Sequence, residues 1–264
     1  MAGDGARSED DREAVEATRR LVHELAPDDV ELQTLWREEN LGCKRAVEGA
    51  ITWFFEHEDE GIVIEDDCVP GDSFFPFMEL MLERYRSDER IMHLSGYAHH
   101  PEDEDGYYFD RVPAVWGWAT WRRAWDRYRS DVPRMTEDQR SRLRGGFASD
   151  SEATYYTDKF DEVARGDLDS WAFAWVFSVI TNHGLCVRPM RNLVENIGVG
   201  DERATHTRRR WMGIKSNAAS SVRFTEPPEP LYVVPDHARE KRFFERSMRR
   251  PLYWLRRRLK ERRG

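Results

Sequence analysis

Three consecutive acidic residues, Glu65, Asp66 and Asp67, directly follow a short apolar run at residues 61–64. A continuous apolar run of this length is typical of a strand buried on both faces of a parallel sheet. Open α/β sheets bind ligands at the carboxyl ends of their strands. Adjacent carboxylates repel one another, and a hard cation with oxygen ligands relieves that repulsion. The junction therefore predicts a site for Mg²⁺ or Mn²⁺, with a solvated acidic turn as the alternative.

The elements that would position these acids follow an α/β pattern, because strand-like and helix-like segments alternate through about residue 100. The apolar spacing and the capping residues predict helices at 8–26, 43–57, 74–86 and 171–180, and polar helices within 131–168 with a break at Gly145-Gly146. Strands are predicted at 30–36, 61–64, 90–95 and 185–188. An aromatic cluster at 116–121 is expected to lead into a helix.

The segment from Gly61 to Pro70, followed by Ser73-Phe74-Phe75, resembles the metal-binding DxD region of GT-A-fold, nucleotide-sugar-dependent glycosyltransferases. It is similar in particular to bacterial and archaeal sugar-transferase-like proteins, which are distantly similar to the N-acetylglucosaminyltransferase that starts complex N-glycan branches. The resemblance covers roughly residues 2–210, and its further motifs occur in the family's order: Asn40-Leu41-Gly42, Trp116-Gly117-Trp118, Asp169-Ser170-Trp171 and the segment from Asn192 to His206.

The resemblance implies a GT-A-type core, with a mixed, mainly parallel sheet and flanking helices. Family members begin with a strand and a helix that supply much of the nucleotide pocket, whereas this chain starts at what resembles the end of the second strand. We therefore expect that about one βα unit is missing and that a strand edge is exposed, which favours association or poor solubility. The expected organisation is a transferase-like domain at 1–212, a linker at 213–235 and a basic amphipathic tail at 236–264.

The resemblance also implies site residues. On the donor side, it makes Asp67 the direct metal ligand and places Glu65 and Asp66 at the ribose and the donor sugar. Asp4 would hold the nucleotide base, and Arg45 is a weaker match to a donor-side basic residue. Asp169 would be the catalytic base, and His206 would touch the metal or the diphosphate. The acceptor or sugar pocket would be lined by Trp116, Gly117 and Trp118.

Each of these assignments has a structural alternative. Asp169 could cap the helix that starts at Ser170. His206 could be a solvated histidine, since three arginines follow shortly after it. Trp116 and Trp118 could pack in the core, although aromatic faces also stack on sugars. The pair His99-His100, with the acids after it, is interpreted as a flexible loop.

The function that the resemblance implies is metal-dependent, inverting transfer of a sugar from a nucleotide-diphosphate donor to a hydroxyl of a glycan, lipid-linked or protein acceptor. In that reaction Asp169 accepts the proton of the acceptor hydroxyl. A non-catalytic carbohydrate- or nucleotide-binding remnant is the alternative. A metal-dependent phosphohydrolase ranks last, because the sequence has no second acidic cluster at an obvious spacing for a two-metal site.

Charge limits the partners. The formal net charge is -9, but residues 239–263 hold twelve Lys or Arg against three Glu, so the rest of the chain carries about -18. Such a body repels polyanions, and we expect no nucleic-acid binding. The aromatic and basic tail suits either an anionic membrane surface or the protein's own acidic body. Three cysteines without CxxC spacing and the absence of a signal-peptide pattern predict a cytoplasmic protein, with the tail adding a hypothesis of membrane association at the inner face.

Overall fold

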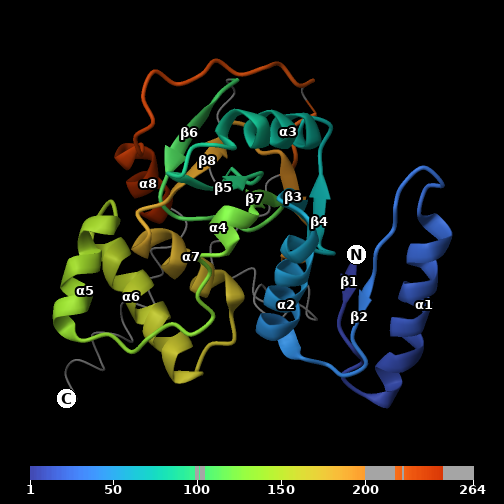
Figure 1. The fold of residues 1–264 in the computed structure, drawn as a ribbon. Coiled ribbons are helices and arrows are strands. Elements are labelled where there is room, and N and C mark those ends of the chain that lie inside the picture. The colour runs from blue at the N-terminus through green and yellow to red at the C-terminus, as the bar shows by residue number, and fades with distance from the viewer. Residues whose placement is uncertain (99–100, 102–104, 200–217, 222, 246–264) are drawn as a thin grey trace.

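A five-stranded sheet forms the centre of the computed structural model, which describes residues 1–98, 101, 105–199, 218–221 and 223–245 (Figure 1). The strands occur in the order β3-β7-β5-β8-β6. Their bounds are Glu60–Val63 for β3, Trp118–Trp121 for β7, Ile91–Ser95 for β5, Leu185–Pro189 for β8 and Tyr107–Asp110 for β6. The strands expected near residues 61–64, 90–95 and 185–188 are therefore confirmed.

The sheet is mixed, as expected, but the expectation that it is mainly parallel is wrong. Only β5 and β8 pair in parallel, and the other three pairings are antiparallel. The difference arises at β7, which lies between β3 and β5 and runs opposite to both. Because β3, β5 and β8 run in the same direction, their carboxyl ends lie at the same end of the sheet. Glu65 to Asp67 follow β3 at that end.

Helices cover both faces of the sheet (Figure 1). One face carries α3 (Phe74–Tyr85), and the other carries α2 (Gly42–His57), the short α4 (Arg122–Trp125) and α7 (Trp171–Thr181). Strand β8 illustrates the packing, because Leu185 and Val187 join the core cluster on the α3 side while Cys186 joins the cluster on the α7 side. A strand covered on both faces has no position for a solvated side chain, and even the one charged residue of β8, Arg188, is buried in an ion pair with Asp110.

The predicted polar helices and their break are also present. Helix α5 (Glu137–Leu143) is followed by a 3₁₀ turn at Arg144–Gly146 and by α6 (Asp150–Arg165). Helix α6 packs against α7 in a third core cluster, which also contains Phe244 at the end of α8 (His237–Phe243). In the part of the chain that the structure describes, no helix is both long and apolar enough to cross a membrane.

The N-terminal residues form a separate two-stranded sheet, in which β1 (Ala2–Gly3) pairs in parallel with β2 (Leu35–Trp36). Helix α1 (Glu9–Leu25) connects the two strands, and none of its residues is fully buried. The expected strand over 30–36 is thus much shorter than predicted. Within the described residues, β3 lies at the edge of the five-stranded sheet and does not pair with β1 or β2.

A third pair of strands, which the sequence analysis did not predict, forms a short antiparallel ribbon from β4 (Cys68–Pro70) and β9 (Val194–Asn196). Main-chain hydrogen bonds extend it at both ends: the Ile197 amide donates to the Asp67 carbonyl at 2.8 Å, and the Gly71 amide donates to the Leu193 carbonyl at 2.9 Å. Within β4, the buried Cys68 alternates with the exposed Val69, and Asp67 lies in the turn directly before the strand.

Candidate functional site

The acidic residues after β3 form a turn in which the Glu65 carbonyl accepts a hydrogen bond from the Cys68 amide at 3.0 Å. Asp66 is exposed, whereas Glu65 and Asp67 are partly buried. Burial, followed by the charges of Asp67 and Asp66, raises the pKa of Glu65 to about 7. The Glu65 carboxyl group therefore titrates near neutral pH, and a bound cation would favour its ionised form.

Asp67 is oriented by the β4–β9 ribbon. Its carbonyl accepts the hydrogen bond from Ile197, and its Oδ1 accepts one from the Cys68 thiol at 3.5 Å. Its Oδ2 lies against the main chain of Gly198, where an added Cβ would come within 2.5 Å of that oxygen. Only a residue without a side chain leaves room for the Asp67 carboxylate in this position.

Asp169 is exposed and directly precedes α7. The alternative role expected for it, capping that helix, belongs instead to Ser170, whose side chain accepts from the Phe173 amide at 3.5 Å. The Asp169 carboxylate lies beside the first turn of α2, since a Cβ added to Gly42 would be 3.5 Å from its Oδ2. Within the described residues, this carboxylate makes no hydrogen bond or ion pair, so it is available to a ligand.

Cys43 connects the two acidic segments. Burial, then the charge of Glu65, then that of Asp169 raise the pKa of the Cys43 thiol to about 11. Glu65 and Asp169 are far apart in the sequence, and both lie close enough to the first turn of α2 to act on one thiol. A cysteine with this pKa stays protonated at neutral pH and is a poor nucleophile.

Asp4 occupies the same end of α2. Its carboxylate accepts hydrogen bonds from the amides of Gly5, Leu41 and Gly42 at 2.9–3.1 Å. Helix termini leave their first amides without partners inside the helix, and a carboxylate satisfies them well. Asp4 thus caps α2 from a position about forty residues earlier in the chain.

The aromatic motif is divided between the core and its margin. Trp118 is fully buried and stacks on His93 and Trp171, at ring-centroid distances of 5.0 and 5.7 Å. Trp118 therefore presents no free ring face to a sugar. It packs in the core, which was the alternative expected for it. Trp116 is partly buried and packs edge-on against Tyr97, with their ring centroids 4.6 Å apart. Gly117, between the two tryptophans of the motif, has a left-handed φ of 55°.

The remaining predicted residues are more peripheral. Arg45 is exposed in the first turn of α2 and makes no ion pair within the described part of the chain. His206 and the His99-His100 pair lie outside the described residues.

The described side chains do not form a complete metal cage by themselves. Among the described residues, no three His, Cys, Asp or Glu side chains are placed to hold a metal ion. Mg²⁺ is usually held by one or two carboxylates together with substrate phosphates, rather than by a cage of protein ligands. Asp67, with an oriented carboxylate next to two further acids, fits that type of site.

Cys43, Cys68 and Gly198 also contact or influence these acids, and no site role was expected for any of the three. Gly198 follows β9, a strand that the sequence pattern does not indicate, so its contact with Asp67 could not be predicted. No protein-family model matches the chain, and no curated protein matches its sequence.

Proposed function

We propose that the chain is a nucleotide-sugar-dependent glycosyltransferase that acts with inversion at the anomeric carbon, on a GT-A-type core. The observation that carries the proposal is the approach of Glu65, at the end of β3, and Asp169, before α7, to the same first turn of α2. The proposed reaction uses one acid to hold the metal on the donor side and another as the general base on the acceptor side. The two segments supply one each.

The acids after β3 take the donor side. When Mg²⁺ or Mn²⁺ is bound at Asp67, it supplies the positive charge that stabilises the leaving nucleoside diphosphate. Because burial raises the pKa of Glu65 to about 7, this side chain can either accept a hydrogen bond from a ribose or sugar hydroxyl or donate one. Asp66 is exposed and can accept hydrogen bonds from the same ligand.

Asp169 takes the acceptor side as the general base. Its carboxylate accepts the proton of an acceptor hydroxyl while that oxygen forms a bond to the anomeric carbon. The bond from the anomeric carbon to the diphosphate oxygen breaks on the opposite face, and the electron pair leaves with the diphosphate. The exposed position of Asp169 and its freedom from the capping role of Ser170 support this assignment.

One observation favours the alternative of a non-catalytic remnant that binds a carbohydrate or a nucleotide. In the described residues, β3 lies at a sheet edge and the β1–β2 pair is separate from the main sheet. A donor pocket next to β3 would then have little support on that side.

Isothermal titration with UDP-sugars and GDP-sugars in the presence of Mn²⁺, combined with an assay for nucleoside diphosphate release, distinguishes these functions. Metal-dependent binding with turnover supports the transferase, and binding without turnover supports the remnant. We expect Asp67→Ala to abolish metal-dependent binding, and Asp169→Asn to keep donor binding and lose turnover. Asp72→Ala, an exposed acid in the turn before α3, serves as the control. Full activity of Asp67→Ala would refute the proposed site.

A further inference from the structure

Helix α1 has two sides that carry apolar residues, and one of them packs against the protein. The packed side carries Val15, Arg19 and Val22, all partly buried. Arg19 lies over the ring of Trp36 in β2, 5.7 Å from its centroid, and donates to the Arg37 carbonyl at 2.5 Å. This side therefore makes the contact between α1 and the β1–β2 pair.

The second apolar side of α1 is open to solvent. It consists of Ala14, Ala17, Leu21 and Leu25, which we call the α1 stripe. Spacings of three and four residues place these side chains along one side of the helix. Leu21 and Leu25 are 50% and 75% exposed. Single exposed leucines are common on protein surfaces, whereas a contiguous apolar stripe is typical of an interaction surface.

Acidic side chains border the α1 stripe. Asp10, Glu13 and Glu24 each lie three or four residues from a member of the stripe, so they are its neighbours on the helix surface. None of the three makes a hydrogen bond or an ion pair within the described residues, whereas other acids of α1 pair with arginines three residues away. A second α1 helix would bring the same acids against these, and an anionic lipid surface would also repel them. The stripe therefore fits a partner that is both apolar and basic.

The basic tail has this composition. Its residues 246–264, which lie outside the described part of the chain, hold nine Lys or Arg and one Glu. Leu252, Leu255 and Leu259 recur at spacings of three and four residues, which is typical of an amphipathic helix. The tail thus complements the α1 stripe both in charge and in the spacing of its apolar residues.

The point from which residues 246–264 start is far from α1 of the same chain. Phe244 is fully buried in the core cluster that α6 and α7 share, so it fixes that point. In Figure 1, α8 and α1 lie at opposite sides of the view, with α7, α2 and the β1–β2 pair between them. Each of these three layers is roughly 10 Å thick. The stretch from Phe244 to Leu252 spans at most about 28 Å, so it would have to be fully extended to reach its own α1.

We propose that the tail of one copy docks on the α1 stripe of a second copy, and that the exchange is reciprocal. The leucines of the tail pack on Leu21 and Leu25, and its arginines face Asp10, Glu13 and Glu24. The apolar contact supplies most of the affinity, because exposed ion pairs stabilise little, while the charges select the partner. A reciprocal exchange forms two equivalent contacts and closes into a dimer. Neither surface takes part in the proposed transfer reaction.

Sedimentation velocity of the full chain, over a series of concentrations, tests the proposal. We expect the wild-type protein to form a dimer. Leu21→Glu combined with Leu25→Glu should weaken dimerisation about hundredfold, and so should Leu255→Glu combined with Leu259→Glu in the tail. Leu231→Glu is the matched control, because this leucine is 83% exposed and lies outside both surfaces. A wild-type protein that stays monomeric, or a dimer that both double variants leave intact, would overturn the proposal.

A mixture of the two double variants identifies the contact. Each variant lacks one of the two surfaces, so neither should dimerise alone. The intact tail of the α1 variant can still dock on the intact stripe of the tail variant. We therefore expect the equimolar mixture to form a heterodimer that is weaker than the wild-type dimer, because one contact remains instead of two.

A mixture that stays monomeric would show that the tail does not dock on α1 of a second copy. Flotation with phosphatidylglycerol vesicles examines the membrane as the other partner of the tail. Binding of the wild-type protein to these vesicles, together with a monomer in solution at every concentration, would assign the tail to a lipid surface and refute the proposal.

Discussion

The main chain of Gly198 lies against the carboxylate of Asp67, so closely that a Cβ at position 198 would come within 2.5 Å of Oδ2. The φ angle of Gly198 is outside the left-handed region, so an alanine there would be strained only by this contact. The alternating register of β4 and β9 brings the two residues together, because Ile197 faces Asp67 across the ribbon. Gly198 thus decides how much room the proposed metal ligand has.

We expect Gly198→Ala to weaken Mn²⁺ binding about tenfold, a change of about 1.4 kcal/mol, because the Asp67 carboxylate must move away from the new methyl group. Titration of Mn²⁺ measures the effect. Gly145→Ala is the matched control, since a Cβ at that position meets nothing within 4 Å. If the wild-type protein binds Mn²⁺ and Gly198→Ala binds it equally well, Asp67 is not the ligand. If the wild type binds no Mn²⁺, the proposed function itself fails.

Asp4→Ala should lower the free energy of unfolding by about 1–2 kcal/mol, because the first amides of α2 lose their acceptor. Urea unfolding and hydrogen exchange at Leu41 and Gly42 measure the loss. Asp29→Ala, in the exposed connection between α1 and β2, should change neither quantity. Unchanged stability together with a loss of nucleotide binding would instead favour the role in holding the base that the family resemblance implies.

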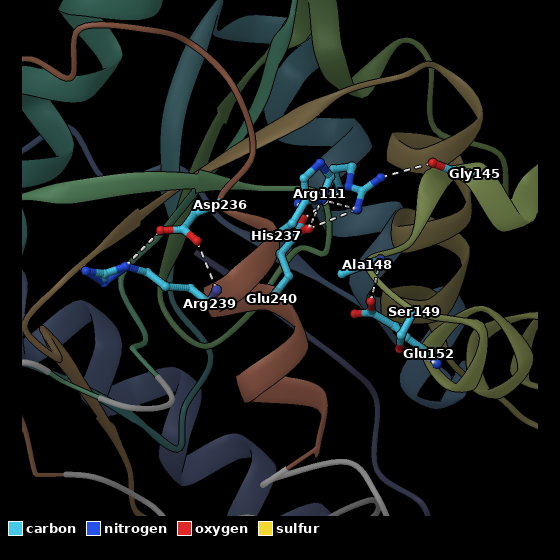
Figure 2. Close-up of polar contacts among 9 residues, drawn as sticks. All are labelled: Arg111, Gly145, Ala148, Ser149, Glu152, Asp236, His237, Arg239 and Glu240. Atoms are coloured by element: carbon cyan, nitrogen blue, oxygen red, sulfur yellow. Dashed lines mark hydrogen bonds and ion pairs between the residues drawn. The ribbon is translucent and has the colours of Figure 1, made fainter.

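Glu240 holds α8 to the body through a buried ion pair. Figure 2 shows its carboxylate at the guanidinium of Arg111, which also donates to the Gly145 carbonyl. The side chains of Arg111 and Glu240 are only 13% and 3% exposed. Glu240→Ala leaves the arginine without its partner and should cost about 3 kcal/mol of stability.

Chemical denaturation provides the measurement, and Arg142→Ala provides the comparison. The Arg142–Asp138 pair is 78% and 70% exposed, so its loss should cost less than about 0.5 kcal/mol. A similarly small loss in Glu240→Ala would mean that α8 is held mainly by Phe244, which is fully buried in the third core cluster.

Helices and fully covered strands could be predicted well, because their signals are local. The apolar spacing identified α1, α2, α3 and α7, and the Gly145-Gly146 pair marked the break before α6. The direction and order of strands could not be predicted, because pairing depends on contacts distant in the sequence. The tetrapeptide Trp118–Trp121 illustrates this, since its bulky residues suit the start of a helix as well as the antiparallel strand β7 that it forms.

The candidate site divides in the same way. The turn at Glu65 to Asp67 follows a strand in the sequence and could be found there. The approach of Asp169 to Gly42, the capping of α2 by Asp4 and the contact of Gly198 with Asp67 all join segments distant in the chain. Contacts between segments distant in the chain cannot be predicted from residue types or their spacing. A cap of α7 could also be predicted, but at the wrong residue: Asp169 was the expected cap, whereas its neighbour Ser170 performs the role.

Glu152 makes stability depend on pH. The residue is only 1% exposed, and its carboxyl group accepts a hydrogen bond from the Ala148 amide at 2.8 Å (Figure 2). Burial outweighs that hydrogen bond, and the nearby charge of Glu240 adds to it, so the pKa of Glu152 rises from 4.5 to about 8. The folded state therefore binds a proton that the unfolded state has already lost between these two pH values. The stabilising contribution is complete below pH 4.5 and disappears as the pH rises through about 8.

Glu152→Gln should remove this dependence, because the amide oxygen still accepts from Ala148 while the side chain no longer ionises. We expect the variant to gain melting temperature relative to the wild type at pH 8.5 and to gain none at pH 4.5. A difference of about 1 kcal/mol corresponds to roughly 2–4 °C in a chain of this size. Other buried groups titrate in the same range, so the informative quantity is the difference between variant and wild type across the pH series. Glu137→Gln, whose side chain is 82% exposed, should follow the wild-type curve. A Glu152→Gln curve parallel to that of the wild type from pH 4.5 to 8.5 would show that folding does not raise the pKa of Glu152.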